Sequence, residues 1–185
     1  QVLREQNVAI LGAAIDLEEL TTALDSPTLL IAADGAAGAI SLLPETTAER
    51  AWSRLAFIVT DADGGDGTIE AVKRGKTAFL HAHGDNESDW IKLLKVAKNA
   101  TTPPPLVLTH QTSREIPGMH NPGGFTDGDR AACIAMSLGV PIERIRMLGT
   151  NTREVGRWSG VTEKKRKLVK LQWMGMILQT LGIEY

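Results

Sequence analysis

The stretch LAFIVTDADGGDG, residues 55–67, joins a short apolar run to a turn made of carboxylates and glycines. Leu55–Thr60 is apolar at nearly every position, which is typical of a β-strand buried on both faces of a sheet. Three aspartates and three glycines follow within residues 61–67. The stretch therefore predicts a buried strand that ends in an acidic turn and leads into a helix.

Similar apolar runs recur along the chain and predict a repeating strand–helix pattern. The further predicted strands are Val8–Leu11, Thr28–Ala33, Thr77–His81, Leu106–Thr109 and Ile145–Leu148. Between and after them, apolar residues at three- and four-residue spacing predict helices over Asp16–Leu24, Gly35–Leu43, Thr68–Arg74, Ser88–Ala100, Thr126–Leu138 and Thr162–Leu181. This alternation predicts an α/β fold: a doubly wound, mostly parallel, Rossmann-like sheet with helices on both faces.

The composition is that of an ordinary globular chain. Its 185 residues, 43% apolar and 23% charged, suit a single domain, so we expect residues 1–185 to form one α/β catalytic domain. Because the chain begins with Gln1 rather than Met, it reads as trimmed of a short N-terminal segment or renumbered. A single cysteine, Cys133, and the lack of a signal-peptide pattern favour a reducing, cytoplasmic location.

The charge balance excludes several classes of partner. A net charge of -2 argues against binding to nucleic acid or to an anionic membrane, and no apolar run reaches the roughly 20 residues of a membrane span. The total hides an asymmetry, because residues 1–90 carry a net -9 and residues 91–185 a net +7. We interpret most lysines near the start of the last helix as part of a solvent-exposed face. The alternative is that one of them contacts a nucleotide phosphate.

Ligands of doubly wound sheets bind outside the carboxyl ends of the strands, so the residues after each strand are the candidates. Asp61 and Asp63 follow the third strand, and carboxylates at this spacing converge to hold Mg²⁺, which prefers oxygen ligands. A polar turn that caps the next helix is the structural alternative. After the second strand, Asp34 either caps a helix or points its carboxylate into the cleft.

The stretch HAHGDNESD, residues 81–89, follows the fourth strand. Its two histidines, His81 and His83, share one face of a strand and suit either a transition metal or contacts to substrate or phosphate; we favour the latter because oxygen ligands surround them. Asp85 and Asp89 lie near the start of the next helix, and helix capping explains one of them better than both.

The stretch GGFTDGDR, residues 123–130, leads into the fifth helix and suits phosphate binding. Gly123 and Gly124 permit close backbone approach, and the helix start offers free N–H groups. Arg130 adds a guanidinium fork that matches phosphate oxygens, whereas Asp127 and Asp129 read as partners of the helix dipole.

Together, TDADG (60–64), HAHGDN (81–86) and GGFTDGDRA (123–131) resemble the archaeal-type 6-hydroxymethyl-7,8-dihydropterin pyrophosphokinases. That family belongs to a superfamily that also includes the thiamin pyrophosphokinases. The resemblance implies transfer of a diphosphoryl group from ATP to the pterin alcohol, with Mg²⁺ and with AMP as the second product. It further implies a role in the synthesis of methanopterin- or folate-type cofactors, and a homodimer.

The resemblance also implies roles for particular residues. Metal would be held by Asp61, Asp63, Asp85 and Asp89; the catalytic set would be Asp61, Asp63, His83 and Asp85, with His83 and Asp85 both candidates for the base. Contacts to ATP and pterin would come from Asp34, Asn86, Gly123, Gly124, Phe125, Thr126, Asp127 and Arg130. The chain departs from the family pattern at Ala13-Ala14-Ile15 and at Gly149-Thr150-Asn151, where we expect substrate to be held differently.

Two other functions fit the same residues. One is a thiamin pyrophosphokinase-like enzyme. The other is a non-catalytic, nucleotide-binding accessory protein of surface-filament glycosylation, against which the intact set of acidic residues argues. A Rossmann NAD protein is disfavoured because the GxGxxG pattern is missing after the first strand.

Overall fold

The computed structural model describes residues 3–160 and 163–185 and is built on a six-stranded, wholly parallel sheet. Its strands, in the order β5-β4-β3-β2-β1-β6, are β1 (Asn7–Leu11), β2 (Thr28–Ala33), β3 (Leu55–Thr60), β4 (Thr77–Ala82), β5 (Leu106–His110) and β6 (Ile145–Leu148). Each predicted strand is confirmed to within one residue at either end. Continuous apolar runs located these strands well because a parallel sheet with helices on both faces buries both sides of each strand.

The helices agree with the sequence-based prediction less well than the strands do. They are α1 (Leu17–Ala23), α2 (Glu45–Arg54), α3 (Gly65–Lys73), α4 (Glu87–Asn99), α5 (Asp127–Ser137) and α6 (Lys164–Leu181), with 3-10 segments η1 (Asp34–Leu42) and η2 (Ile142–Arg144). The predicted helix over 35–43 is thus a 3-10 segment, and α2 was not predicted. Thr162, the expected start of α6, lies outside the described residues.

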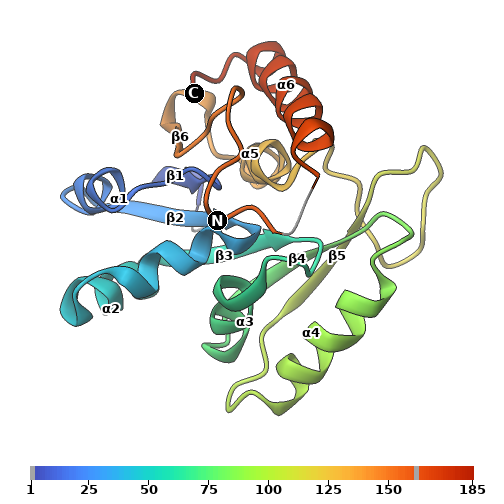
Figure 1. Ribbon diagram of the computed structural model, residues 1–185, viewed down its shortest axis with the longest axis horizontal. Helices are drawn as coiled ribbons and strands as arrows, with labels where there is room; N and C mark the ends of the chain where they lie inside the picture. Colours follow the sequence, from blue (N-terminus) through green and yellow to red (C-terminus); the bar gives the residue numbers. More distant parts are fainter. Residues whose placement is uncertain (1–2, 161–162) are drawn as a thin grey trace.

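Two hydrophobic cores lie on opposite faces of the sheet, and the strand residues alternate between them. In β1, Ala9 and Leu11 belong to the core that includes residues of α1, α2, α3 and α4, whereas Val8 and Ile10 belong to the core that includes residues of α5 and α6. Figure 1 shows this layering: α2, α3 and α4 lie below the sheet and α5 and α6 above it. The predicted doubly wound fold is therefore confirmed.

The topology places a reversal of strand order beside β1. The chain proceeds from β1 to β5 in one direction, and then crosses through α5 to add β6 on the other side of β1. Right-handed crossovers in opposite directions put their helices on opposite faces, and such a reversal leaves a crevice at the carboxyl ends of the strands. No helix in the described part of the chain is long and apolar enough to cross a membrane.

Candidate functional site

Three carboxylates meet at the carboxyl ends of β2 and β3. Asp34, Asp61 and Asp63 each offer one oxygen atom, and these atoms lie within 4.8 Å of one another. The Oδ1 atom of Asp34 accepts hydrogen bonds from the hydroxyl of Thr60 at 2.6 Å and that of Thr68 at 3.4 Å. We call these three aspartates the acid cluster.

The backbone is strained directly after each of the two strands, β2 and β3, that lead into the acid cluster. Asp34 has a φ of 50° and Ala62 a φ of 81°, and these are the only residues other than glycine with positive φ in residues 3–160 and 163–185. A non-glycine residue in the left-handed region costs free energy, and such residues concentrate at functional sites. Here the two strained positions are one cluster member and the residue between the other two.

Burial and mutual repulsion perturb the pKa values around the acid cluster. Burial raises the pKa of Asp34 well above its ordinary value, and the charges of Asp127, Asp61 and Asp63 raise it further. Burial also raises the pKa of Asp63, and together with the charge of Asp61 it raises the pKa of Asp127 to about 7. Burial acts to raise the pKa of Asp61 too, but the neighbouring carboxyl of Asp63 and the imidazole of His83 bring it below its ordinary value.

The acid cluster has the donor set of a site for a hard divalent cation. The Oδ1 atom of Asp61 is buried and has no hydrogen-bond partner, which is costly for a carboxylate unless a cation lies beside it. Carboxylate oxygens are the ligands that Mg²⁺ prefers in proteins. The residues therefore fit Mg²⁺, with Asp34 in the cluster in place of the more distant acids expected from the sequence.

Asp85 and Asp89, the other two aspartates expected at the metal, lie outside the acid cluster. The side chain of Asp85 is 77% exposed and its Oδ1 atom lies 2.5 Å from Nδ1 of His83. Asp89 accepts a hydrogen bond from Lys92 at 2.8 Å, on the surface of α4. Neither belongs to a group of three or more ligating side chains among the described residues.

The histidines after β4 have different surroundings. His83 bridges two carboxylates, because its Nε2 atom lies 3.1 Å from Oδ2 of Asp61 while Nδ1 faces Asp85. His81 is buried between Thr109 and Gln111, and burial together with the charge of Arg130 lowers its pKa to about 4. The imidazole of His81 is therefore neutral at physiological pH.

Asn86, expected to contact a ligand, ties two loops together. Its Nδ2 atom donates hydrogen bonds of 2.8 Å to the carbonyl oxygens of Asp61 and His81, and its Oδ1 atom accepts one from the amide of His83. Asn86 is buried. It thus holds the turn after β3 against the turn after β4.

The start of α5 differs from the expected phosphate cradle. The amides of Phe125 and Thr126 donate to the carboxylate of Asp129, and the amide of Gly123 donates to Asn121. These donors are occupied, so the geometry does not favour phosphate binding at Gly123 and Phe125. Thr126 and Asp129 form a reciprocal capping box.

Arg130 and Asp127 project from the first turn of α5 toward the acid cluster. The guanidinium of Arg130 is 3% exposed and donates at 3.5 Å to Asp127 and at 3.4 Å to the carbonyl oxygen of Gly124. Its Nε atom is buried and has no partner. An Arg130 donor therefore remains available to an anionic group.

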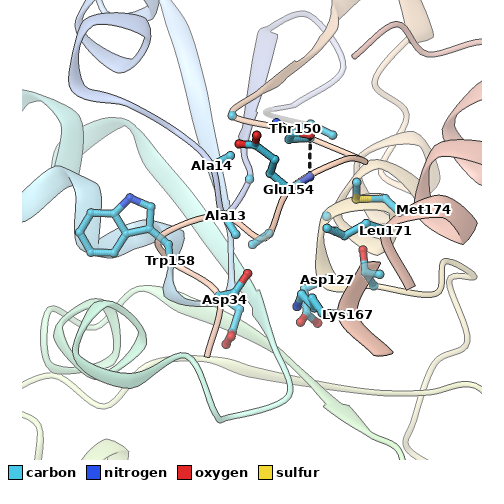
Figure 2. A pocket seen from close by; sticks show the side chains of 18 residues that line it. Ala13, Ala14, Asp34, Asp127, Thr150, Glu154, Trp158, Lys167, Leu171 and Met174 are labelled. Carbon is cyan, nitrogen blue, oxygen red and sulfur yellow. Dashed lines mark hydrogen bonds between the residues drawn. The ribbon is translucent and has the colours of Figure 1, made fainter. Parts of the chain in front are cut away.

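Two pockets flank the acid cluster. The switch-point pocket lies at the ends of β1 and β6 and is lined by Gly12, Ala13, Ala14, Ala33, Asp34, Thr126, Asp127, Gly128, Gly149, Thr150, Asn151, Glu154, Gly156, Trp158, Ser159, Lys167, Leu171 and Met174. Figure 2 shows Asp34, Asp127 and Lys167 along one side of it and Thr150 and Glu154 along the other. The cationic pocket lies at the ends of β3 and β4 and is lined by Asp61, His81, His83, Asp85, Gln111, Phe125, Thr126, Asp127, Arg130, Arg166, Lys167 and Lys170.

Glu154 and Ser159 did not appear among the sequence candidates, and Lys167 was only one of several basic residues for which a phosphate contact was the alternative interpretation. Lys167 lines both pockets, and Glu154 and Ser159 line the switch-point pocket from the segment after β6. Lys167 lies in a run of basic residues with no local feature that singles it out. Only the packing of α6 on α5 brings it to the acid cluster.

Comparisons with known proteins agree with the resemblance seen in the sequence. The chain is 37% identical over 139 residues to the 6-hydroxymethyl-7,8-dihydropterin pyrophosphokinase of Methanothermobacter thermautotrophicus, covering 72% of the chain and 50% of that protein. It is 34% identical over 159 residues to the protein of the same name from Pyrococcus furiosus, covering 83% of the chain and 60% of that protein.

The chain thus spans between half and three-fifths of the length of the curated relatives it matches. No family model matches the chain, and no solved structure matches it. The chain is therefore a homologue, over most of its own length, of archaeal proteins named 6-hydroxymethyl-7,8-dihydropterin pyrophosphokinase.

Proposed function

We propose that this protein transfers a diphosphoryl group from ATP to the hydroxymethyl group of 6-hydroxymethyl-7,8-dihydropterin, giving the pterin diphosphate and AMP for a methanopterin- or folate-type cofactor. The observation that carries the proposal is the acid cluster, in which the buried Oδ1 atom of Asp61 has no hydrogen-bond partner. The names of the two relatives support the choice of reaction.

The acid cluster would hold Mg²⁺ through Asp34, Asp61 and Asp63. When bound, Mg²⁺ would neutralise negative charge on the triphosphate during transfer. His83 acts through Asp61: its imidazole fixes Oδ2 and leaves Oδ1 free for the cation. Such outer partners orient the carboxylates that bind a metal.

Diphosphoryl transfer depends mainly on positioning and on stabilising charge. The hydroxyl oxygen of the alcohol forms a bond to the β-phosphorus, and the bond from that phosphorus to the oxygen shared with the α-phosphate breaks, so AMP leaves with the electron pair. The hydroxyl proton passes to a base, for which the candidates are His83 and Asp85 in the lining of the cationic pocket. The cations that line the cationic pocket would stabilise the phosphate oxygens.

The test is turnover of ATP with 6-hydroxymethyl-7,8-dihydropterin and Mg²⁺, with the nucleotide product identified by chromatography. We expect AMP and the pterin diphosphate in equal amounts. ADP as the product would mean transfer of one phosphoryl group and would contradict the proposal. Thiamin in place of the pterin serves as the competing alcohol, and faster AMP formation with thiamin would reassign the substrate.

The proposal also covers the location, the oligomeric state and the partners of this enzyme. We infer a cytoplasmic homodimer that acts on small molecules and binds neither nucleic acid nor membrane; the near-neutral net charge and the single cysteine support this. Light scattering after size-exclusion chromatography measures the mass in solution. A monomeric mass at micromolar concentration would contradict the dimer.

A further inference from the structure

We propose that the two pockets bind different substrates. The cationic pocket binds the triphosphate of ATP and the switch-point pocket binds the pterin ring. The diphosphoryl group is then transferred at the acid cluster, from one pocket to the other. This inference rests on the proposed function. It adds which pocket each substrate occupies and which side chains distinguish them.

The two pockets meet at the acid cluster. Both are lined by Thr126, Asp127 and Lys167. Asp34 lines the switch-point pocket and Asp61 the cationic pocket, although their carboxylate oxygens lie within 4.8 Å of each other. Ligands in the two pockets would therefore approach each other where the cation ligands are, and transfer between them requires that proximity.

The charges of the two pockets differ in sign. Four cations line the cationic pocket, namely Arg130, Arg166, Lys167 and Lys170, against the carboxylates of Asp61, Asp85 and Asp127. The switch-point pocket has the carboxylates of Asp34, Asp127 and Glu154 and a single cation, Lys167. A polyphosphate carrying several negative charges is attracted to the first pocket and repelled from the second.

The unpartnered buried atoms follow the same division. Four side-chain atoms in residues 3–160 and 163–185 are buried without a hydrogen-bond partner, and each belongs to a residue that lines one of these pockets. Arg130 Nε and Asp61 Oδ1 belong to residues of the cationic pocket, where a hydrogen-bond donor and a cation ligand would serve a metal-bound phosphate. The hydroxyls of Thr150 and Ser159 line the switch-point pocket.

A hydroxyl both donates and accepts hydrogen bonds, whereas a guanidinium only donates. The pterin ring presents amino and ring N–H donors beside oxo and ring-nitrogen acceptors along its edges. The hydroxyls of Thr150 and Ser159, with the carboxylate of Glu154 as an acceptor, match that mixed edge. Phosphate oxygens, which only accept, would leave Glu154 unsatisfied.

The walls of the switch-point pocket suit a flat ring. Leu171 and Met174 lie across the pocket from Ala13 and Ala14 in Figure 2. The segment after β6 is fastened over the end of β1, because the amide of Trp158 donates to the carbonyl of Ala13 at 2.9 Å and its indole N–H to that of Ile15 at 3.3 Å. Small and aliphatic side chains therefore enclose the space between the polar edges.

The experiment measures the binding of each substrate to the whole chain by calorimetry, using a non-hydrolysable ATP analogue with Mg²⁺ and the pterin alcohol separately. Thr150→Val keeps the shape of the side chain and removes the hydroxyl; we expect it to weaken pterin binding about five- to tenfold and nucleotide binding less than twofold. Lys170→Ala is expected to show the converse, with nucleotide binding weakened about fivefold. Thr180→Val and Lys98→Ala, at exposed positions outside both pockets, are the matched controls.

A reversed pattern, or an equal loss of both ligands in both variants, would overturn the division of the pockets. If the unsubstituted protein forms AMP but the variants show no selectivity, the inference alone fails. If it forms no AMP with this alcohol, the proposed function fails and the inference with it. Melting curves check that each variant folds, and Ser159→Ala replaces Thr150→Val if the latter does not.

Discussion

The Nε2 atom of His83 lies 3.1 Å from Oδ2 of Asp61, across the gap between the turns after β4 and β3. The other nitrogen of the same ring faces Asp85 at 2.5 Å. A ring held at both ends fixes the plane of the Asp61 carboxylate. Its second oxygen, Oδ1, then remains buried and unpartnered inside the acid cluster.

His83→Ala tests whether this contact prepares Asp61 for a cation. We expect Mg²⁺ affinity to fall about 10–100-fold, because loss of an outer partner lets the ligand rotate. Calorimetric titration of Mg²⁺ into the protein measures the change. His120→Ala is the matched control, since His120 is exposed and its hydrogen bonds come from its backbone. Equal Mg²⁺ affinity in both variants would show that His83 does not position Asp61.

Asp61→Asn tests the metal assignment itself. At Mg²⁺ concentrations 100 times the Kd, binding adds about 2.7 kcal/mol to the free energy of unfolding, which raises Tm by about 5–10 °C for a chain of this size. We expect Asp61→Asn to lose that rise. Asp89→Asn should keep it, because Asp89 pairs with Lys92 on the surface. Loss of the rise in Asp89→Asn instead would favour the metal set implied by the family resemblance.

Gly64→Ala tests how tightly the acid cluster is built. The φ of Gly64 is -71°, which any residue adopts, so backbone strain plays no part. A Cβ atom there would instead collide with the carboxylate of Asp34 and the hydroxyl of Thr68. We expect a loss of about 1–3 kcal/mol in stability, as for other overpacked sites, together with weaker Mg²⁺ binding.

The control for this substitution is Gly118→Ala. Gly118 has a φ of 78° and open space around it, so alanine would add backbone strain of about 1–2 kcal/mol and no collision. Thermal melts with and without Mg²⁺ compare the two variants. If both lose stability and both keep the same response to Mg²⁺, Gly64 is not needed for the shape of the cluster.

The sequence predicted the sheet well and one of its covering helices poorly. Buried parallel strands are nearly continuous in apolar character, so their limits are visible locally. The buried face of α2 consists of Ala48, Ala51 and Trp52 among polar residues, and two alanines make a weak apolar stripe. In η1, small residues allow close packing: a Cβ at Gly67 of α3 would meet the backbone of Gly35 and Gly38.

The site was predictable where its residues are neighbours in sequence. Asp61 and Asp63 were identifiable from one turn, but the place of Asp34 beside them depends on β2 pairing with β3. The free amides expected at the start of α5 are occupied because Asp129 turns back to bind them. Such long-range pairing and local competition for donors are settled by the folded backbone.

Asp127→Asn tests how much the charge of Asp127 destabilises the folded protein when no cation is bound. Burial and the charge of Asp61 raise the pKa of Asp127 to about 7, whereas in the unfolded chain it titrates near 3.8. Between these values the folded state binds more protons than the unfolded state, so stability falls as pH rises from about 4 to about 7 and then levels off. A neutral asparagine has no such penalty.

The variant should therefore melt at a higher temperature than the unsubstituted protein at pH 8 in the absence of divalent cations, and the difference should become small at about pH 4, below which the charge of Asp127 no longer affects stability. Each 1 kcal/mol of relief corresponds to about 2–4 °C in Tm for a chain of this size. Melting curves across this pH range in a chelating buffer make the measurement. Asp25→Asn provides the control, because Asp25 lies outside the acid cluster and both pockets. A variant that is less stable than the unsubstituted protein at pH 8, and whose stability depends on pH to the same extent, would contradict this expectation. It would show that the charge of Asp127 does not destabilise the folded state, because its contact with Arg130 outweighs the repulsion from the acid cluster.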